Sequence, residues 1–315
     1  MSKKIIFKGS AVAIVTPFDE QNQVNLKMLD KLINFQINNG TQAILVCGTT
    51  GESATLSDEE REKVIKYTIE KINKKIPVIV GTGSNCTEKS MNLSIRAQEL
   101  GADAVIIVTP YYNKTSQSGI IQHYKYIANR IELPVILYNV PSRTGLNIMP
   151  ETYFELSKIE NIVATKEANG DISSIIKTIA MCGDNLAVYS GNDDQTLPIL
   201  ASGGIGIISA FANIAPAISQ KIASSIMQID NEIIKSLNPE SEKSILRSFL
   251  KSRELLIRYQ DLMEALFYDV NPMPVKSALK MMNFDCGNCR LPLVGLNQEC
   301  ENKLRSVMMK HGLIK

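Results

Sequence analysis

Ala104-Val105-Ile106-Ile107-Val108 is a run of five apolar residues whose neighbours on both sides have a different periodicity. In residues 87–100 and 119–129, apolar residues recur at i, i+3 and i+4, which predicts amphipathic helices. A continuously apolar strand between two such helices is typical of a parallel sheet that helices cover on its faces.

The same unit recurs along the first part of the chain. Seven further apolar runs rich in Val and Ile occupy residues 11–15, 43–46, 77–80, 134–138, 162–166, 186–189 and 206–209. Eight strand-then-helix units over about 230 residues are typical of the (β/α)8 barrel. The sequence therefore predicts an α/β protein with a TIM barrel, whose active site lies at the carboxyl ends of the strands.

After about residue 230 only helical patterns remain, at residues 241–268, 274–282 and 297–311. Ser236-Leu237-Asn238-Pro239 marks the break before them, because proline can begin a helix but not continue one. We therefore expect a barrel catalytic domain in residues 1–230 and a C-terminal helical domain in residues 231–315.

Composition excludes several classes of function. The 34 basic and 32 acidic residues leave a net charge of +2, so no basic surface for nucleic acid or membrane is expected. Neither a signal peptide nor a membrane span is evident, which predicts a soluble, cytoplasmic protein. Two histidines and the single Cys286-x-x-Cys289 spacing are too few ligands for a zinc site, so we expect no metal and free thiols.

The sixth apolar run ends in a lysine: Ile162-Val163-Ala164-Thr165-Lys166-Glu167. Burying an unpaired ammonium group is costly. Such a lysine can instead serve as a neutral amine that attacks a carbonyl and forms a Schiff base. The alternative is a side chain that extends out of the strand to pair with a carboxylate. This run alone leaves both open.

The second run is followed by Gly48-Thr49-Thr50-Gly51-Glu52-Ser53. Two glycines around two threonines predict a tight turn with exposed N–H groups and two hydroxyls, which suits a carboxylate. The alternative is a plain turn that caps the next helix. Further on, Ser57 and Glu60 predict a capping box at a helix start.

Tyrosines follow two other runs, in Thr109-Pro110-Tyr111-Tyr112-Asn113 and in Tyr138-Asn139-Val140-Pro141-Ser142-Arg143. A tyrosine at a strand end can carry a proton, and the fork of donors on Arg143 suits a substrate carboxylate. The alternatives are tyrosines that pack against a neighbour and an arginine in a surface ion pair.

The residues at the ends of the last two predicted strands give weaker evidence of a functional site. In Ser190-Gly191-Asn192-Asp193-Asp194 the acidic pair is expected to cap the helix that follows. Gly203, Gly204 and Gly206 lie close to no basic residue, so we expect close backbone packing there rather than a phosphate site.

Together these motifs describe one chemistry. Lys166 would form an imine with a 2-keto acid whose carboxylate rests on the Thr49-Thr50 turn. Tyr138 would move protons, and Arg143 would receive a second, acidic substrate.

In these motifs the chain resembles the dihydrodipicolinate synthase family, within the wider group of pyruvate-dependent class I aldolases that includes N-acetylneuraminate lyase. The resemblance runs through residues 13–18, 48–53, 109–113, 138–145, 166–168, 271–276 and 291–293. It implies a lyase that condenses pyruvate with L-aspartate 4-semialdehyde to 4-hydroxy-tetrahydrodipicolinate, in lysine and diaminopimelate biosynthesis, without cofactor or metal.

The resemblance also implies residue roles. Lys166 would form the pyruvate imine, and Thr50, Tyr138 and Tyr112 would relay protons, with Tyr112 reaching across a dimer interface into the partner's site. Thr49 and Thr50 would bind the pyruvate carboxylate and Arg143 that of the semialdehyde, with Gly191 and Ile208 beside the imine. The expected assembly is a homotetramer built as a dimer of dimers.

One part of the family's pattern is altered. Lysine-inhibited relatives hold the inhibitor's ammonium group with an acidic residue, where this chain has Lys89, and have histidines where it has Asp58 and Arg61. Ser53, Asn85 and Tyr111 of that site remain. A positive charge at Lys89 would repel the ligand, so we expect weak or absent inhibition by L-lysine.

Two other functions stay open at this point. One is a pyruvate-dependent aldolase for another aldehyde, such as a sialic acid or keto-deoxy-sugar lyase, although those relatives lack the Ser142-Arg143 pair. The other is a non-catalytic barrel that senses a ligand.

Overall fold

A computed structural model describes residues 3–224 and 238–315, and its centre is a closed barrel of parallel strands that pair in chain order, with β8 joining β1. The strands are β1 Gly9–Ala13, β2 Ala43–Val46, β3 Val78–Gly81, β4 Ala104–Val108, β5 Val135–Asn139, β6 Ile162–Glu167, β7 Ala187–Ser190 and β8 Gly206–Ser209. The predicted (β/α)8 TIM barrel is confirmed. The largest shift is in β1, which begins at Gly9 rather than residue 11 because Gly9 pairs with Gly206 of β8.

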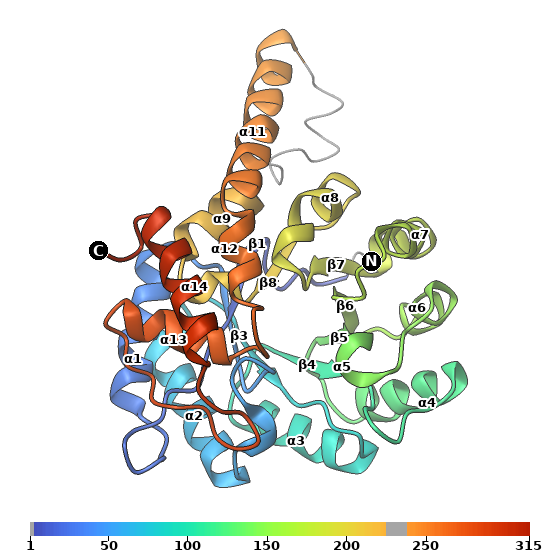
Figure 1. Cartoon of the computed structure of the whole chain (residues 1–315). Helices are drawn as coiled ribbons and strands as arrows, with labels where there is room; N and C mark the ends of the chain where they lie inside the picture. Colours follow the sequence, from blue (N-terminus) through green and yellow to red (C-terminus); the bar gives the residue numbers. More distant parts are fainter. Residues whose placement is uncertain (1–2, 225–237) are drawn as a thin grey trace.

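Helices follow the strands and form the outer layer (Figure 1). Their bounds are α1 Leu26–Asn38, α2 Asp58–Ile72, α3 Thr87–Glu99, α4 Gln117–Ala128, α5 Pro141–Thr144, α6 Pro150–Leu156, α7 Ile172–Cys182, α8 Thr196–Ala201 and α9 Pro216–Ser224, with 3₁₀ turns η1 Ser53–Thr55, η2 Gly183–Asn185, η3 Asp193–Gln195 and η4 Phe211–Asn213. The predicted capping box of α2 is confirmed, since Ser57 Oγ accepts from Glu60 N and the Glu60 carboxylate accepts from Ser57 N.

The C-terminal part contains α11 Pro239–Arg258, α12 Gln260–Ala265, α13 Met273–Met281 and α14 Gln298–Lys310. Figure 1 shows α11 projecting from the barrel, with α12, α13 and α14 gathered against its side. Pro239 begins α11 as predicted, whereas Ser236, Leu237 and the proposed domain boundary at residue 230 lie outside the described residues.

The prediction of one helix over residues 241–268 is wrong. The helix breaks at Tyr259, whose ψ of 10° departs from the helical value, and α12 ends at Ala265. The ring of Tyr259 lies 6.2 Å from that of Phe211 and 4.8 Å from that of His311, so its packing favours the turn. The apolar spacing continues across Tyr259, and for that reason it could not reveal the change of direction.

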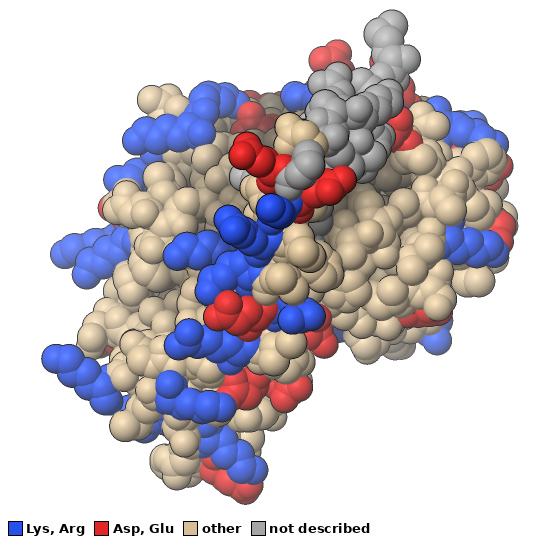
Figure 2. Space-filling model, turned by 90° about the horizontal axis from the view of Figure 1, so that it is seen from above, with Lys and Arg blue, Asp and Glu red and all other residues tan. Residues whose placement is uncertain are grey.

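The surface carries no single dominant charge on the face seen in Figure 2, where basic and acidic side chains are interspersed with uncharged ones. That view agrees with the net charge of +2. Among the described residues, no helix has the length and hydrophobicity that a membrane crossing needs.

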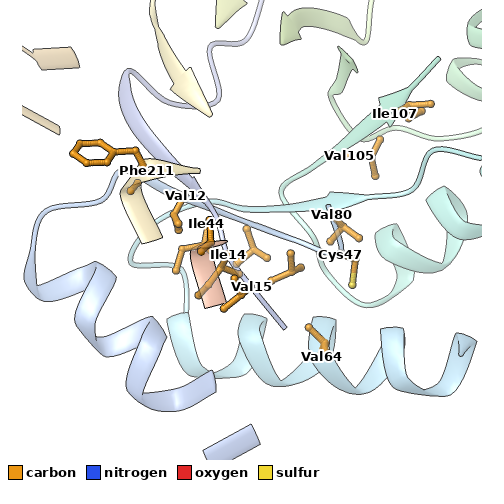
Figure 3. Close-up of a cluster of buried hydrophobic side chains, with 14 of the residues drawn as sticks. Val12, Ile14, Val15, Ile44, Cys47, Val64, Val80, Val105, Ile107 and Phe211 are labelled. Carbon is orange, nitrogen blue, oxygen red and sulfur yellow. The ribbon is translucent and has the colours of Figure 1, made fainter. Parts of the chain in front are cut away.

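Each strand divides its side chains between two apolar layers, because successive residues point to opposite faces. The outer layer lies between strands and helices, and Figure 3 shows Val12, Ile44, Val80 and Ile107 there with Val64 of α2. The inner layer fills the barrel with Ala11, Ala13, Ala43, Leu45, Ile79, Ala104, Ile106, Ile136, Ala164, Tyr189 and Ile208. Inward-pointing residues that lie closer to the carboxyl ends of the strands than this inner layer therefore project into the opening of the barrel at that end.

One extra residue in β6 decides which of its side chains enter the barrel. Val135 of β5 pairs with Ile162, but the next residue, Ile136, pairs with Ala164, so Val163 has no partner there. Such a β-bulge shifts the alternation by one position. Ile162 consequently belongs to the outer layer and Ala164 to the inner one, and Lys166, two residues further, also points inward.

Close backbone packing was predicted for Gly203, Gly204 and Gly206; it is confirmed for Gly204 and Gly206, whereas a Cβ on Gly203 would meet only the side chain of Ile179 at 3.4 Å. A Cβ atom on Gly206 would lie 2.3 Å from the carbonyl oxygen of Gly9, and one on Gly204 would lie 2.6 Å from Ile199 Cγ2. Only glycine fits this approach of β8 to β1 without displacing backbone.

Candidate active site

A cavity of about 440 Å³ opens at the carboxyl ends of the strands, where the sequence predicted the active site. Its size is within the range of sites for small molecules. Its polar side chains are Thr49, Thr50, Ser53, Tyr138, Ser142, Arg143, Lys166, Asn192, Asp269 and Asn271. The structure thus brings together residues that follow β2, β5, β6 and β7 and one segment from the C-terminal part.

Lys166 is the buried amine of this cavity. Only 6% of the residue is exposed, and its Nζ lies 4.5 Å from the centre of the Tyr138 ring. Tyr138 and Lys166 are direct partners in the β5–β6 ladder. In the described chain, Lys166 forms no ion pair with a carboxylate, which removes the alternative role that the sequence left open. Buried Asp193 interacts with Lys166 through charge but does not pair with it directly. A buried lysine without a direct ion pair is suited to nucleophilic attack on a carbonyl.

Gly191 directly follows β7 and lines the cavity next to the side chain of Lys166. A Cβ at this position would lie 3.0 Å from Lys166 Cε and 2.8 Å from Ala168 Cβ. Any larger residue would therefore displace the lysine side chain. Ile208, which was predicted beside the imine, is fully buried in the inner layer and is not among the lining residues of the cavity.

The turn after β2 is rigid and faces the cavity. Both Cys47 and Glu52 have a left-handed φ of 53°, Ser53 N donates to Gly48 O at 3.3 Å, and Thr16 Oγ1 donates to Gly51 O at 2.7 Å. Thr49 and Thr50 project from this turn into the cavity lining. The next α-helix is capped by Ser57 and not by this turn, so the alternative reading of the turn as a helix cap is wrong.

Arg143 lies on the short helix α5 at the rim of the cavity. Its Nη2 donates to the carbonyl oxygen of Asn271 at 3.4 Å, and in the described chain it has no carboxylate partner. Among residues 3–224 and 238–315, therefore, no carboxylate forms the surface ion pair that was the alternative for Arg143. A guanidinium group with free donors at the cavity mouth suits a bound carboxylate.

Tyr112 is the one predicted catalytic residue that this chain does not bring to its own cavity. It is 90% exposed, has φ of 68°, and is absent from the cavity lining. The alternative for this tyrosine was packing against a neighbour in its own chain, and its exposure shows no such packing in the part of the chain that the structure describes.

Asp193 behaves differently from the prediction. Instead of capping the helix after β7, it is buried and caps the turn after β8: Ser209 Oγ donates to its Oδ1 at 2.5 Å, and Ala210 N and Phe211 N donate to Oδ2. Burial raises the pKa of Asp193, although these donors oppose the shift. The contact joins the turns after two neighbouring strands, β7 and β8, across 16 to 18 positions of chain, so local sequence could not predict it.

A second cavity of about 480 Å³ adjoins the first and shares Thr49, Arg143 and Asn271 with it. Of the residues predicted for an inhibitor site, it is lined by Ser53, Asp58, Arg61, Lys89 and Tyr111, whereas Asn85 is not on its wall. The guanidinium of Arg61 is buried and donates to the carbonyl oxygens of Ser53 and Gly81 at 3.2 and 2.5 Å. The cavity therefore combines three cationic side chains, Arg61, Lys89 and Arg143, with two acidic ones, Glu52 and Asp58.

Sequence reasoning missed the residues that connect the C-terminal part to the site. Asn271 Nδ2 donates to Thr50 Oγ1 at 2.9 Å, and Lys276 Nζ lies 2.6 Å from Glu52 Oε1 in a buried ion pair. Both residues lie in the Asn271–Lys276 segment that carried the family resemblance, but no local pattern indicates which residues they touch.

Within the described residues, no three His, Cys, Asp or Glu side chains gather as metal ligands. All six cysteines are free thiols, Cys286 and Cys289 among them.

Comparison with known proteins then decides the family. The model of the dihydrodipicolinate synthetase family matches residues 6–311. The chain belongs to this family. A 4-hydroxy-tetrahydrodipicolinate synthase of Clostridium perfringens is 47% identical over 310 residues, covering 98% of this chain and all of that protein.

Solved structures of family members agree in fold. The dihydrodipicolinate synthase of Acinetobacter baumannii, described as chloride-inhibited and complexed with pyruvate, has 40% identity and a TM-score of 0.89 over 98% of this chain and 100% of that one. The enzyme of Cyanidioschyzon merolae with lysine bound has 36% identity and a TM-score of 0.88 over 99% and 100%. Membership in this family confirms that the chain is an enzyme, a lyase.

Proposed function

We propose that this member of the dihydrodipicolinate synthetase family condenses pyruvate with L-aspartate 4-semialdehyde to give 4-hydroxy-tetrahydrodipicolinate. The observation that carries the proposal is the buried Lys166, without a direct ion pair, in one cavity with Tyr138, Thr50 and Arg143. The names of the relatives, and the pyruvate in the A. baumannii structure, support the choice of substrates.

The roles follow from chemistry and position. The amine of Lys166 attacks the carbonyl carbon of pyruvate, and loss of water leaves an imine whose methyl group is acidic. Thr49 and Thr50 hold the pyruvate carboxylate. Tyr138 and Thr50 carry protons, first to the departing hydroxyl and then away from the methyl group. The enamine carbon adds to the aldehyde, and the amino group of the semialdehyde displaces Lys166 as the ring closes.

Arg143 is assigned to the carboxylate of the semialdehyde. It lies at the cavity mouth, away from the buried amine, where a second substrate would arrive after the first. A bidentate guanidinium–carboxylate pair would orient the aldehyde toward the enamine carbon.

Two assays side by side test this proposal. Borohydride added with pyruvate should fix a reduced adduct on Lys166, detectable by mass spectrometry, and none on a Lys166→Ala variant. Wild-type enzyme should consume pyruvate with aspartate semialdehyde but should not cleave N-acetylneuraminate, and Arg143→Ala should raise the KM for the semialdehyde alone. An adduct without condensation would indicate an aldolase for another aldehyde, whereas no adduct would favour a ligand-sensing barrel.

The proposal includes a homotetramer, a dimer of dimers in which Tyr112 of one chain completes the proton relay of its partner. The exposure of Tyr112 supports this role, since a tyrosine that is 90% exposed is available to another chain. Co-expression of Tyr112→Phe and Lys166→Ala chains tests it. Mixed dimers should regain activity, because one of their two sites receives both intact residues; if Tyr112 served its own chain, mixing would restore nothing.

We further propose that L-lysine inhibits this enzyme weakly or not at all. The second cavity supports this view because the cationic side chains of Lys89, Arg61 and Arg143 on its wall outnumber the acidic ones of Glu52 and Asp58, and Glu52 is already paired with Lys276. Titration with L-lysine should show no inhibition at micromolar concentration, and Lys89→Glu should increase sensitivity. Half-inhibition of the wild type by micromolar lysine would overturn the prediction. The cytoplasmic location and the two-domain division also remain predictions.

A further inference from the structure

Asn271 is the part of the C-terminal segment that reaches the reacting groups. It lies between α12 and α13, is 7% exposed, and lines both cavities. Its side chain and its main chain each touch a residue with an assigned role. Nδ2 donates to Thr50 Oγ1 at 2.9 Å, and the carbonyl oxygen accepts from Arg143 Nη2 at 3.4 Å.

The bond to Thr50 has a fixed direction. An amide NH₂ group can only donate, so the oxygen of Thr50 must be the acceptor. The hydroxyl hydrogen of Thr50 is therefore left free for another partner. A hydroxyl that accepts one hydrogen bond also becomes a stronger donor of its own. In this arrangement Thr50 is oriented as a donor into the cavity, where a proton relay needs one.

A second observation sets Asn271 apart from an ordinary buried asparagine. Its Oδ1 is buried and accepts no hydrogen bond from the described protein groups. Leaving a buried acceptor unpaired costs about 1–3 kcal/mol. If Asn271 served only for packing, its amide would not be needed at this position. The contacts of Asn271 with Thr50 and Arg143 therefore explain why the cost of an unpaired Oδ1 is tolerated.

We propose that Asn271 is a positioning residue that fixes the hydroxyl of Thr50 as a proton donor and thereby sets the rate of the proton-transfer steps. This inference rests on the function proposed above. It assigns to the C-terminal part of the chain a direct effect on chemistry in the barrel.

The experiment follows one proton transfer without the second substrate. Enzyme and pyruvate are mixed in D₂O, and exchange of the pyruvate methyl hydrogens is measured by NMR. Asn271→Ala should slow this exchange by about 10- to 100-fold, with less than about a threefold change in the KM for pyruvate. Exchange as fast as in the wild type would overturn the inference.

Asn271→Asp gives the sharper test because it keeps the shape of the side chain and replaces the NH₂ donor by a carboxyl group whose ability to donate depends on pH. The ionised carboxylate can only accept, so Thr50 must turn its hydrogen toward it and away from the cavity. The protonated carboxyl group can donate, as the amide does. Exchange by this variant, relative to wild type, should therefore rise as the pH falls from about 8 to about 5. A ratio that stays constant with pH would indicate a merely structural role and overturn the inference.

Two controls distinguish a failure of the positioning role of Asn271 from a failure of the proposed function. Asn297→Asp makes the same chemical change in the C-terminal part, at the N-cap of α14, where aspartate caps equally well, so its exchange rate should match the wild type. Lys166→Ala should show no exchange. If the wild type itself exchanges no hydrogen and forms no borohydride adduct, the proposed function fails; if only the Asn271 variants behave like wild type, the positioning role alone fails.

Discussion

Loss of the buried ion pair between Lys276 and Glu52 should be far more damaging than loss of an exposed pair with the same geometry. Lys276 Nζ lies 2.6 Å from Glu52 Oε1, and the two side chains are 3% and 0% exposed. The other carboxylate oxygen of Glu52 accepts from Arg290 N at 2.9 Å. Lys276→Met would therefore leave a buried carboxylate that keeps the N–H of Arg290 and the thiol of Cys289 as donors but has lost its ion-pair partner.

The size of the effect follows from burial. Removing one member of a buried ion pair costs about 3–5 kcal/mol, because the remaining charge is neither solvated nor neutralised. The unfolding entropy of about 2.1 cal/mol/K per residue gives about 0.66 kcal/mol/K for 315 residues. The melting temperature should then fall by roughly 5–8 °C.

Lys303→Met is the matched control. Lys303 Nζ lies 2.6 Å from Glu299 Oε1, the same distance, but these side chains are 59% and 76% exposed. An exposed pair contributes about 0–1 kcal/mol, so the melting temperature should move by no more than about 1–2 °C.

Scanning calorimetry of wild type, Lys276→Met, Glu52→Gln, the double variant and Lys303→Met measures these differences. In the double variant neither charge is left unpaired, so its loss should be smaller than the sum of the two single losses by at least about 2 kcal/mol. Equal shifts for Lys276→Met and Lys303→Met, or strictly additive losses, would refute the reasoning from burial.

Three further predictions concern stability. Burial raises the pKa of Glu167 to about 8, so its contribution to stability is complete below about pH 4.5 and is lost as the pH rises through about 8. Urea unfolding between pH 5 and pH 8 should show wild type losing up to about 1.4 kcal/mol per pH unit relative to Glu167→Gln; parallel curves would contradict this. Ser57→Ala, which removes the cap of α2, should cost about 1 kcal/mol in the same assay, and an unchanged midpoint would count against the capping role. Gly206→Ala should cost about 3 kcal/mol because its Cβ would meet Gly9 O, whereas Gly295→Ala, where nothing lies within 4 Å, should be neutral; equal losses would reject the contact argument.

The sequence predicted what depends on local pattern. The continuous apolarity of the strands is a direct result of burial on both faces, so all eight were found, and Ser57 with Glu60 predicted the start of α2. Lys166 was found because a charged residue at the end of an apolar strand breaks that pattern.

The remainder depends on contacts between distant segments. Asn271 meets Thr50 across 221 positions of chain, and Asp193 reaches the turn after β8 because β7 and β8 pair side by side in the sheet. Neither residue differs in type from an ordinary loop residue. Tyr112 could be recognised only through the family, because its proposed partner belongs to another copy of the chain.

Because Val163 has no partner in β5, the orientation of Lys166 is sensitive to the number of residues that follow this bulge in β6. The orientation of the amine depends on whether an odd or an even number of residues separates it from the first regular pair after the bulge, Ala164 with Ile136. Deleting Val163 would remove the bulge and leave Ala164 opposite Ile136 and Lys166 opposite Tyr138, so the amine would still point into the barrel. Inserting one residue between Ala164 and Lys166, with the bulge kept, would preserve a closed barrel but turn Lys166 toward the helices and bring a neighbouring side chain into the cavity. A gene could thus lose this activity through a single-codon insertion while still encoding a well-folded protein, so a count of residues between the bulge and the lysine is a simple criterion for separating active from silent copies.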